Sequence, residues 1–357
     1  SFSFRSSESL ATERNEKLAY PIPCSRYPND SPNRNLVRKT QCNAGWDWGP
    51  CIMSVGIHES IKLIETGSSL FESFSVIPRL KEDKWEVEFE CWIEAIKEKR
   101  VSVKAEIAGK SIEGIFDLKE GTNKYSIFLS IPVSDVERWW PNGFGGQKLY
   151  KAEISVDGDK KERKVGFRTL KVKNEPTMGG KELTICVNGR DIFSKGANWI
   201  PLDAIPSRMT RERYDELLQD AVDANMNMIR VWGGGWYEKE DFYDLCDEKG
   251  ILLYHDMMFA CSTYPSDEWF LRSVEKELRD QVRRLKSHPC IALWCGNNED
   301  LGALTWYEET IKNRDRYLKD YERLNDDTVG RIVKEEDSDR IFWPSSPCAG
   351  PGDYSDN

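Results

Sequence analysis

The sequence lacks the features of structural metal sites and of membrane segments. It contains three histidines, His58, His255 and His288, and its ten cysteines include no Cys-x-x-Cys pair. Structural zinc sites use closely spaced Cys and His ligands, so we expect none here and interpret most of the cysteines as small apolar packing residues. No apolar run approaches the ~20 residues that span a bilayer. The sequence therefore predicts neither a metal nor a transmembrane segment.

The start of the sequence lacks the features of a signal peptide, and its end lacks a predicted helix or strand. Residues 1–10 have no initiator methionine, no basic start and no apolar core, which argues against a signal peptide. Residues 343–357 are polar and rich in proline and glycine, which predicts a loop without a closing element. We therefore expect a central piece of a longer protein, and no targeting signal indicates its localisation.

Positive charge is not in excess. Lys and Arg total 51 and Asp and Glu total 61, so the formal net charge is −10. This balance argues against nucleic acid or an anionic membrane surface as the partner. Aromatic residues are plentiful, with 13 Trp, 13 Tyr and 14 Phe among 357 residues. We interpret this surplus as large aromatic cores or as binding sites for flat ligands, and sugars are the usual flat ligands of tryptophan.

The hydrophobic pattern divides the chain into three regions, and the length alone suggests roughly two or three domains. Residues 1–66 are loop-rich, although alternating apolar positions predict a strand over residues 59–64. Residues 67–175 contain several stretches that alternate at period two, which predicts an immunoglobulin-like β-sandwich. The clearest of these stretches are residues 85–93, 101–107 and 151–156.

Residues 176–357 change to an alternation of apolar strands and amphipathic helices. Helices are predicted over residues 211–225, 238–249 and 267–286. Strands are predicted over residues 191–198, 226–232, 251–257, 290–296 and 340–344. This alternation indicates a parallel sheet wrapped by helices, and the lack of Gly-x-Gly-x-x-Gly after the first strand argues against a dinucleotide-binding fold. We therefore predict the first part, about five strands, of a (β/α)8 barrel.

Polar side chains lie at the ends of the predicted strands, where barrel enzymes place their active sites. Glu299 follows two amides, Asn297 and Asn298, and an apolar strand, so its carboxyl group is placed to protonate a leaving group while an amide holds a substrate hydroxyl. The alternative is a helix N-terminus that Asn298 caps and Glu299 stabilises through the dipole. Arg230 and Asp256 end two other strands. Asp256 is either a substrate contact or, as we favour, the partner of Arg230.

Tryptophans lie beside two glycine-containing turns. Trp46 and Trp48 flank Asp47, so a carboxylate that can bind vicinal hydroxyls stands between two rings that can stack on a sugar. The alternative is a structural turn whose indoles fill a domain interface. Residues 230–236 contain three consecutive glycines without the Lys-Ser/Thr of a P-loop, so we expect a tight turn that faces Trp232 toward a ligand.

Six motifs together resemble a known family. They are Arg38-Lys39, Gly45-Trp-Asp-Trp-Gly-Pro50, Trp140-Pro-Asn-Gly143, Val165-Gly-Phe-Arg168, Arg230-Val-Trp-Gly-Gly-Gly235 and Trp294-Cys-Gly-Asn-Asn-Glu299. In this order, and over nearly the whole chain, they resemble the β-mannosidases of glycoside hydrolase family 2. The resemblance implies a jelly-roll sugar-binding domain, an immunoglobulin-like sandwich and a (β/α)8 catalytic barrel. We place their parts at residues 1–66, 67–175 and 176–357.

The resemblance also implies a retaining reaction that releases terminal β-mannose from an oligosaccharide, without a metal or an organic cofactor. Glu299 would be the general acid/base, and Asn298 would contact the hydroxyl next to the anomeric carbon. Further side chains would line the sugar pocket. These substrate-binding candidates are Trp46, Asp47, Trp48, Arg230, Trp232, Asp256 and Trp306.

Two parts of the family pattern are not found in the sequence. A jelly roll needs about eight strands, and only its last part fits into residues 1–66. The nucleophilic glutamate of the family follows the seventh barrel strand, whereas the prediction reaches the fifth. A retaining mechanism needs two carboxyl groups about 5–5.5 Å apart. We therefore expect this chain alone to be inactive, and the remainder of its enzyme or a second polypeptide to complete the barrel.

Alternatives stay open at this stage. Related family 2 enzymes act on internal mannosyl bonds, β-glucosaminides or β-galactosides, and an aromatic pocket does not distinguish these sugars. In a different class, the chain would be a non-catalytic carbohydrate-binding protein that keeps the fold and has lost the nucleophile.

Overall fold

The N-terminal region runs along one end of the molecule without joining a sheet. The computed structural model describes residues 1–354, and residues 1–66 form helix α1 (Ser7–Glu16), the short 3₁₀ turns η1 (Arg34–Leu36) and η2 (Gln41–Asn43), and irregular chain. The Ser6 hydroxyl caps α1 by accepting a hydrogen bond from the Ser9 amide. The strand expected over residues 59–64 is wrong, because this stretch has no pairing neighbour and its Leu63 is fully exposed.

The predicted immunoglobulin-like sandwich is confirmed. One antiparallel sheet has the order β1-β2-β5 and the other the order β4-β3-β6-β7. Their bounds are Ser69–Lys81 (β1), Lys84–Ala95 (β2), Lys99–Ile107 (β3), Lys110–Leu118 (β4), Gly121–Pro132 (β5), Tyr150–Val156 (β6) and Asp159–Val165 (β7). Alternate residues face inward, so Trp85, Val87 and Phe89 of β2 are all completely buried between the sheets. The short turn η3 (Val133–Asp135) follows β5.

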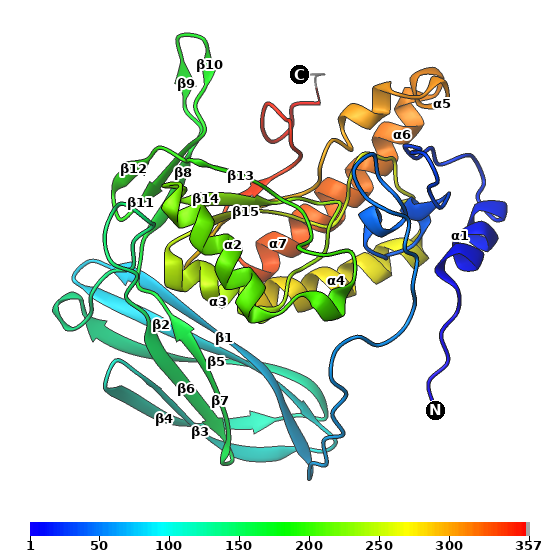
Figure 1. The fold of residues 1–357 in the computed structure, drawn as a ribbon. Coiled ribbons are helices and arrows are strands. Elements are labelled where there is room, and N and C mark those ends of the chain that lie inside the picture. The colour runs from blue at the N-terminus through cyan, green and yellow to red at the C-terminus, as the bar shows by residue number, and fades with distance from the viewer. Residues whose placement is uncertain (355–357) are drawn as a thin grey trace.

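A small antiparallel sheet of order β12-β11-β8 joins the sandwich to the β/α region. Its strands are Leu170–Lys173 (β8), Thr184–Val187 (β11) and Arg190–Ile192 (β12), and the hairpin β9 (Pro176–Thr177) and β10 (Gly180–Lys181) projects beyond it in Figure 1. The single strand expected over residues 191–198 is therefore two strands, β12 and β13 (Gly196–Trp199). The buried Asn227 side chain bonds the Phe193 carbonyl and the Lys195 amide, and these bonds turn the chain from one sheet into the other.

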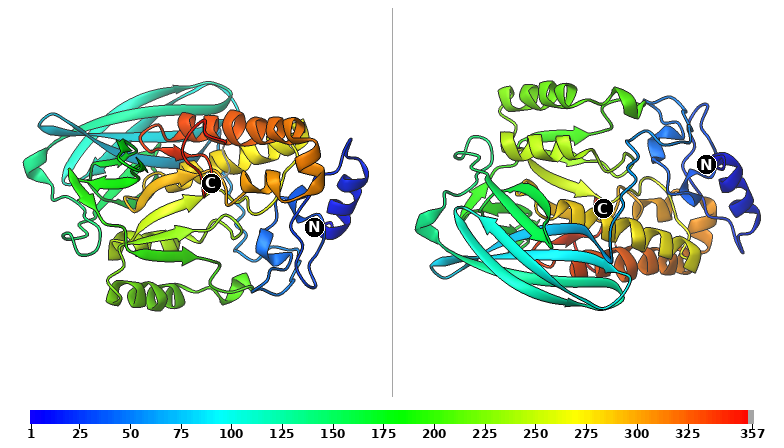
Figure 2. Two further views of the ribbon diagram at one scale, coloured as in Figure 1. Left: turned by 90° about the horizontal axis from the view of Figure 1, so that it is seen from above. Right: turned by 90° about the horizontal axis from the view of Figure 1, so that it is seen from below.

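The β/α region contains a parallel sheet of order β13-β14-β15-β16-β17, as the sequence predicts. Its remaining strands are Met228–Val231 (β14), Leu252–Asp256 (β15), Ile291–Cys295 (β16) and Phe342–Trp343 (β17). The helices between them are α2 (Arg211–Asp223), preceded by the turn η4 (Pro206–Arg208), α3 (Glu240–Lys249), α4 (Glu268–Leu285) and α7 (Arg331–Glu336). In Figure 2 the strands fan out between α2 on one side and α4 and α7 on the other.

The helices bury the faces that their apolar spacing predicts. On α4, every third or fourth residue is buried completely: Phe270, Val274, Leu278, Val282 and Leu285. Helix α3 ends at Gly250, which has φ +73°. A Cβ atom there would lie 2.6 Å from the backbone nitrogen of Asn142, in the loop between β5 and β6. Both the backbone angle and the close approach of this loop therefore require glycine.

The charged segment after β16 is helical in several pieces. They are η5 (Gly302–Thr305), α5 (Glu308–Lys312), α6 (Arg314–Tyr321) and the π-helical stretch η6 (Glu322–Gly330), which continues into α7. Within residues 1–354, no helix combines the length and the apolar character that crossing a membrane requires.

Polar contacts fix the sandwich against the start of β16. The Arg168 guanidinium donates to the carbonyls of Pro289 and Ile291, both at 2.8 Å, and Arg340 also donates to the Ile291 carbonyl. A buried ion pair joins Lys286, just after α4, to Glu90 of β2. The sandwich is therefore bonded to the same strand that leads, at its other end, to the predicted acid.

Candidate active site

The residues of the candidate site come together at the carboxyl end of the parallel sheet. Arg230 lies on β14, Asp256 ends β15, and Asn298 and Glu299 follow β16. The backbone of Asn298 forms parallel bridges to Ala260 on one side and to Ser346 on the other, which extends the sheet beyond its regular strands. Three loops are therefore held in register around Glu299.

Arg230 organises a polar network at this edge. Its guanidinium contacts both carboxylate oxygens of Asp256, at 3.1 and 2.7 Å, and donates to the Asn298 side-chain oxygen at 2.9 Å. Asp256 has no exposed surface, and one of its oxygens also accepts from the Gly233 amide. Burial raises the pKa of Asp256, and the guanidinium opposes this rise. The pairing of Asp256 with Arg230 is thus observed, and a substrate contact of Asp256 stays a prediction.

Glu299 is half-buried and has an unusual backbone conformation, with φ +64°. The Cys261 thiol donates to its Oε2 atom at 3.2 Å. The alternative that Asn298 caps a helix is wrong, since its side chain bonds Arg230 and Cys261 and the turn after it starts only at Gly302. The amide that does stabilise the turn is Asn297, whose oxygen accepts from the Asp300 backbone.

Four rings form an aromatic cluster that packs against Cys261, the residue bonded to Glu299: Tyr27, Trp46, Trp48 and Trp232. Trp46 stacks on Tyr27 at 4.5 Å and meets Trp232 edge to face at 4.9 Å, and Trp48 lies 5.7 Å from Trp232. Trp46 and Trp232 are buried, whereas Trp48 is 48% exposed. Trp46 thus fills the interface between the N-terminal region and the sheet, and Trp48 has a face open to a ligand.

The glycines after Trp232 are explained by close packing. A Cβ atom on Gly234 would lie 1.9 Å from the Trp232 ring, and one on Gly233 would lie 2.4 Å from the Phe259 carbonyl oxygen. The tight turn expected here is therefore needed to fold the indole back over its own loop.

Two further candidates lie at the margin of this arrangement. Asp47 is exposed beside Trp48. Trp306 is 45% exposed, and its ring lies 6.5 Å from Tyr307, whose hydroxyl hydrogen-bonds Ser25 of the N-terminal region. Trp306 thus stands beside the N-terminal region, while the aromatic cluster is built from other rings.

The sequence reasoning missed three residues that hold the site together. Tyr27 stacks on Trp46, and the Arg34 guanidinium covers the same ring at 4.5 Å while donating to the carbonyls of Ala260 and Cys261. Cys261 bridges Asn298 and Glu299. The position of Cys261 beyond the end of β15 was the only available signal, because these contacts join segments far apart in the sequence.

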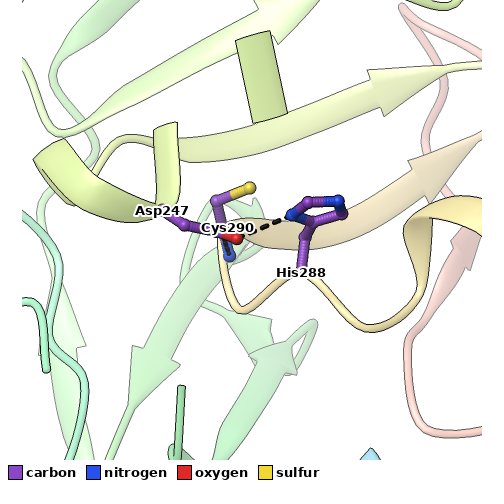
Figure 3. Close-up of side chains that lie close together, drawn as sticks. All are labelled: Asp247, His288 and Cys290. Atoms are coloured by element: carbon purple, nitrogen blue, oxygen red, sulfur yellow. Dashed lines mark hydrogen bonds and ion pairs between the residues drawn. The ribbon is translucent and has the colours of Figure 1, made fainter. Parts of the chain in front are cut away.

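Asp247, His288 and Cys290 are close enough to hold a metal ion, at the opposite end of β16 (Figure 3). Both imidazole nitrogens of His288 are occupied, Nδ1 by Asp247 at 2.6 Å and Nε2 by Glu240 at 3.3 Å. Burial lowers the pKa of His288, but Asp247 and Glu240 outweigh this and raise it to about 9. A protonated imidazole offers no lone pair, so the donor set does not fit a metal, and we interpret the cluster as structural.

Comparisons with known proteins agree with this architecture. The family description "Glycosyl hydrolase 2 galactose-binding domain-like" matches residues 1–59, and "Glycosyl hydrolases family 2" matches residues 70–168. The crystal structure of a β-D-mannosidase from Dictyoglomus thermophilum superposes with a TM-score of 0.86 at 33% identity, covering 98% of this chain and 43% of that one. An exo-chitosanase from Amycolatopsis orientalis, at 20% identity and a TM-score of 0.62, shares the fold.

The fold and the matched family descriptions define the chain as a glycoside hydrolase homologue. The β-mannosidase of Capra hircus is 38% identical over an alignment of 371 positions that covers 97% of this chain and 42% of the relative. The β-mannosidase of Rattus norvegicus is 39% identical, covering 88% and 38%. The chain belongs to glycosyl hydrolase family 2 and is a homologue of its β-mannosidases. It spans about two fifths of the length of the curated relatives it matches.

Proposed function

We propose that this chain carries the acid/base half of a retaining exo-β-mannosidase that releases terminal β-D-mannose from oligosaccharides. The observation that carries the proposal is the placement of Glu299 at the carboxyl end of β16, with Asn298 beside it and the aromatic cluster adjacent. Glu299 donates a proton to the glycosidic oxygen as the bond to the anomeric carbon breaks. It then accepts a proton from the water that releases mannose.

The neighbouring side chains have distinct parts in this proposal. Asn298 contacts the hydroxyl next to the anomeric carbon, and Arg230 fixes the orientation of its amide by bonding the oxygen. The exposed ring of Trp48 stacks on the sugar, and Asp47 binds hydroxyl groups at its edge. Trp232, Trp46 and Asp256 shape the wall behind these contacts.

A second carboxyl group is needed for retention, and we propose that it lies outside the described residues. Asp256, in the Arg230 network, and Asp300, next to Glu299 in the sequence, are both buried, with exposed fractions of 0% and 2%. Arg230 and the Gly233 amide hold the carboxylate of Asp256, so it is not free to act as the nucleophile. A further part of the same enzyme, or a second polypeptide, would therefore supply the nucleophile and pack beside β17.

Glu299→Gln in the complete gene product tests the proposal. Glutamine keeps the size of the side chain but cannot donate an acidic proton, so hydrolysis of mannosides with poor leaving groups should fall by about 10²–10⁴-fold. For activated aryl mannosides, whose aryl group leaves without protonation, the rate of the first step should fall less. Wild-type rates in the variant on every substrate would refute the role of Glu299.

The sugar is tested separately with the unaltered gene product. Nitrophenyl glycosides of mannose, glucosamine and galactose, together with an internally linked mannan, distinguish the family 2 alternatives. A preference for glucosaminide or galactoside would overturn the mannose assignment, and binding without hydrolysis of any of them would favour the non-catalytic alternative.

A further inference from the structure

We propose that Cys261 is a positioning residue that holds one oxygen of the Glu299 carboxyl group and so decides which oxygen carries the catalytic proton. The inference rests on the proposed function of Glu299. Its basis is a short chain of hydrogen bonds: the Asn298 side-chain nitrogen donates to the Cys261 sulfur at 3.2 Å, and the thiol donates to Glu299 Oε2, also at 3.2 Å. Asn298 and Glu299 are the two residues with the most direct roles in the proposed reaction.

The backbone fixes the direction of this thiol. Cys261 and Glu299 both occupy the left-handed region, with φ +52° and +64°, which residues other than glycine adopt only when their surroundings impose it. The surroundings do so here. The Cys261 amide donates to the Asn298 carbonyl at 2.8 Å, the Glu299 amide donates to Ser346, and Arg34 donates to the Cys261 carbonyl.

Burial keeps the thiol in the form that can donate. Cys261 is 7% exposed and packs with Trp46 and Trp232. Burial raises its pKa, and the negative charge of Glu299 raises it further, so the sulfur retains its hydrogen at physiological pH. A thiol of this kind is a weak hydrogen-bond donor and not a nucleophile.

The contact serves both protonation states of the acid. When Glu299 is ionised, Oε2 accepts from the thiol as a carboxylate oxygen. When Glu299 is protonated, Oε2 can still accept as the carbonyl oxygen, provided that the proton sits on Oε1. The thiol therefore leaves Oε1 as the atom that gives its proton to the leaving group and later takes one from water, and no atoms are transferred to sulfur.

Activity measurements on the complete gene product test this with three variants. In Cys261→Ala, kcat/KM should fall about tenfold for a mannoside with a sugar leaving group, because a hydrogen bond to a charged group is lost. For a dinitrophenyl mannoside it should fall by less than about twofold, since that leaving group needs no proton. Cys261→Ser retains a donor and should recover most of the loss.

Cys91→Ala is the matched control. Cys91 is completely buried in the sandwich and far from the site, so this variant removes the same atoms without touching Glu299. It should leave the ratio of the two rates as in the wild type. Equal losses on both substrates in Cys261→Ala, or no recovery in Cys261→Ser, would overturn the proposal.

A second measurement, on the 357-residue chain, does not depend on catalysis. The infrared S–H stretch of Cys261 is isolated by subtracting the spectrum of Cys261→Ala, and donation to a carboxylate lowers its frequency. Glu299→Gln presents a weaker acceptor and should raise that frequency. An unchanged band would overturn the positioning contact. A band that moves in a protein whose gene product hydrolyses no mannoside would support the contact and refute the proposed function.

Discussion

Raising the pH should destabilise the folded chain through His288, which Figure 3 shows beside Asp247 and which also contacts Glu240. The buried imidazole has its pKa raised from 6.5 to about 9 because the two carboxylates outweigh the cost of burial. A group whose pKa is higher in the folded state contributes stability fully below its unfolded pKa. That contribution is lost as the pH rises through the folded pKa.

The size of the effect follows from the two pKa values. A difference between 6.5 and about 9 corresponds to a loss of about 3 kcal/mol in the free energy of unfolding between pH ~6 and pH ~10. His255 affects stability at low pH instead. Burial lowers its pKa from 6.5 to about 3, so the free energy of unfolding falls only as the pH drops below 6.5. Buried thiols such as Cys290, with a pKa raised by burial, also weaken stability in alkali.

Urea unfolding of the wild type and of His288→Gln at several pH values isolates the histidine, because both proteins share the thiols and His255. The wild type should be more stable by about 3 kcal/mol at pH ~6, and the difference should vanish near pH ~10. His58→Gln changes an exposed histidine and should keep the wild-type dependence on pH. A difference between wild type and His288→Gln that stays constant over this range would refute the protonated cluster.

Two further predictions concern packing. Trp46→Ala removes a buried indole and should lower the free energy of unfolding by about 3–5 kcal/mol, as measured by urea titration. Trp48→Ala removes an exposed indole and should lower it by less than about 1 kcal/mol, while weakening the binding of mannose oligosaccharides in isothermal titration. Equal losses of stability in the two variants would contradict the assignment of Trp46 to the interface and of Trp48 to the ligand. Lys286→Met removes the buried partner of Glu90, which keeps a second ion pair with Lys124, and should destabilise the chain by about 1–2 kcal/mol. Adding Glu90→Gln should recover most of this loss, and a double variant no more stable than Lys286→Met would show that the ion pair is not the cause.

Regular periodicity made the framework predictable. The apolar spacing of residues 267–286 matched the buried face of α4, and period-two alternation matched the strands of the sandwich. The same signal failed at residues 59–64, because alternation describes a strand only where a neighbour pairs with it. It also joined β12 to β13, since the turn between them depends on the side chain of Asn227, more than thirty residues downstream.

The polar network of the candidate site was predictable because its residues follow strands. Arg230, Asp256 and Asn298 stand at strand ends, and the structure brings them into one network. Cys261 and Arg34 could not be found in this way, because their part depends on the N-terminal region packing across the loop after β15. Helix α1 was missed because it carries no apolar stripe along one face.

The anchoring of β16 by Arg168 has a consequence for shortening or transplanting the β/α region. The five residues of β16 extend over about 17 Å. The strand is hydrogen-bonded to Arg168 at its start and ends just before Glu299. Deleting the sandwich together with Arg168 would remove the donor to the carbonyls of Pro289 and Ile291, and the start of β16 would lose these two hydrogen bonds. A smaller scaffold that keeps Glu299 in its present position should therefore retain the sandwich.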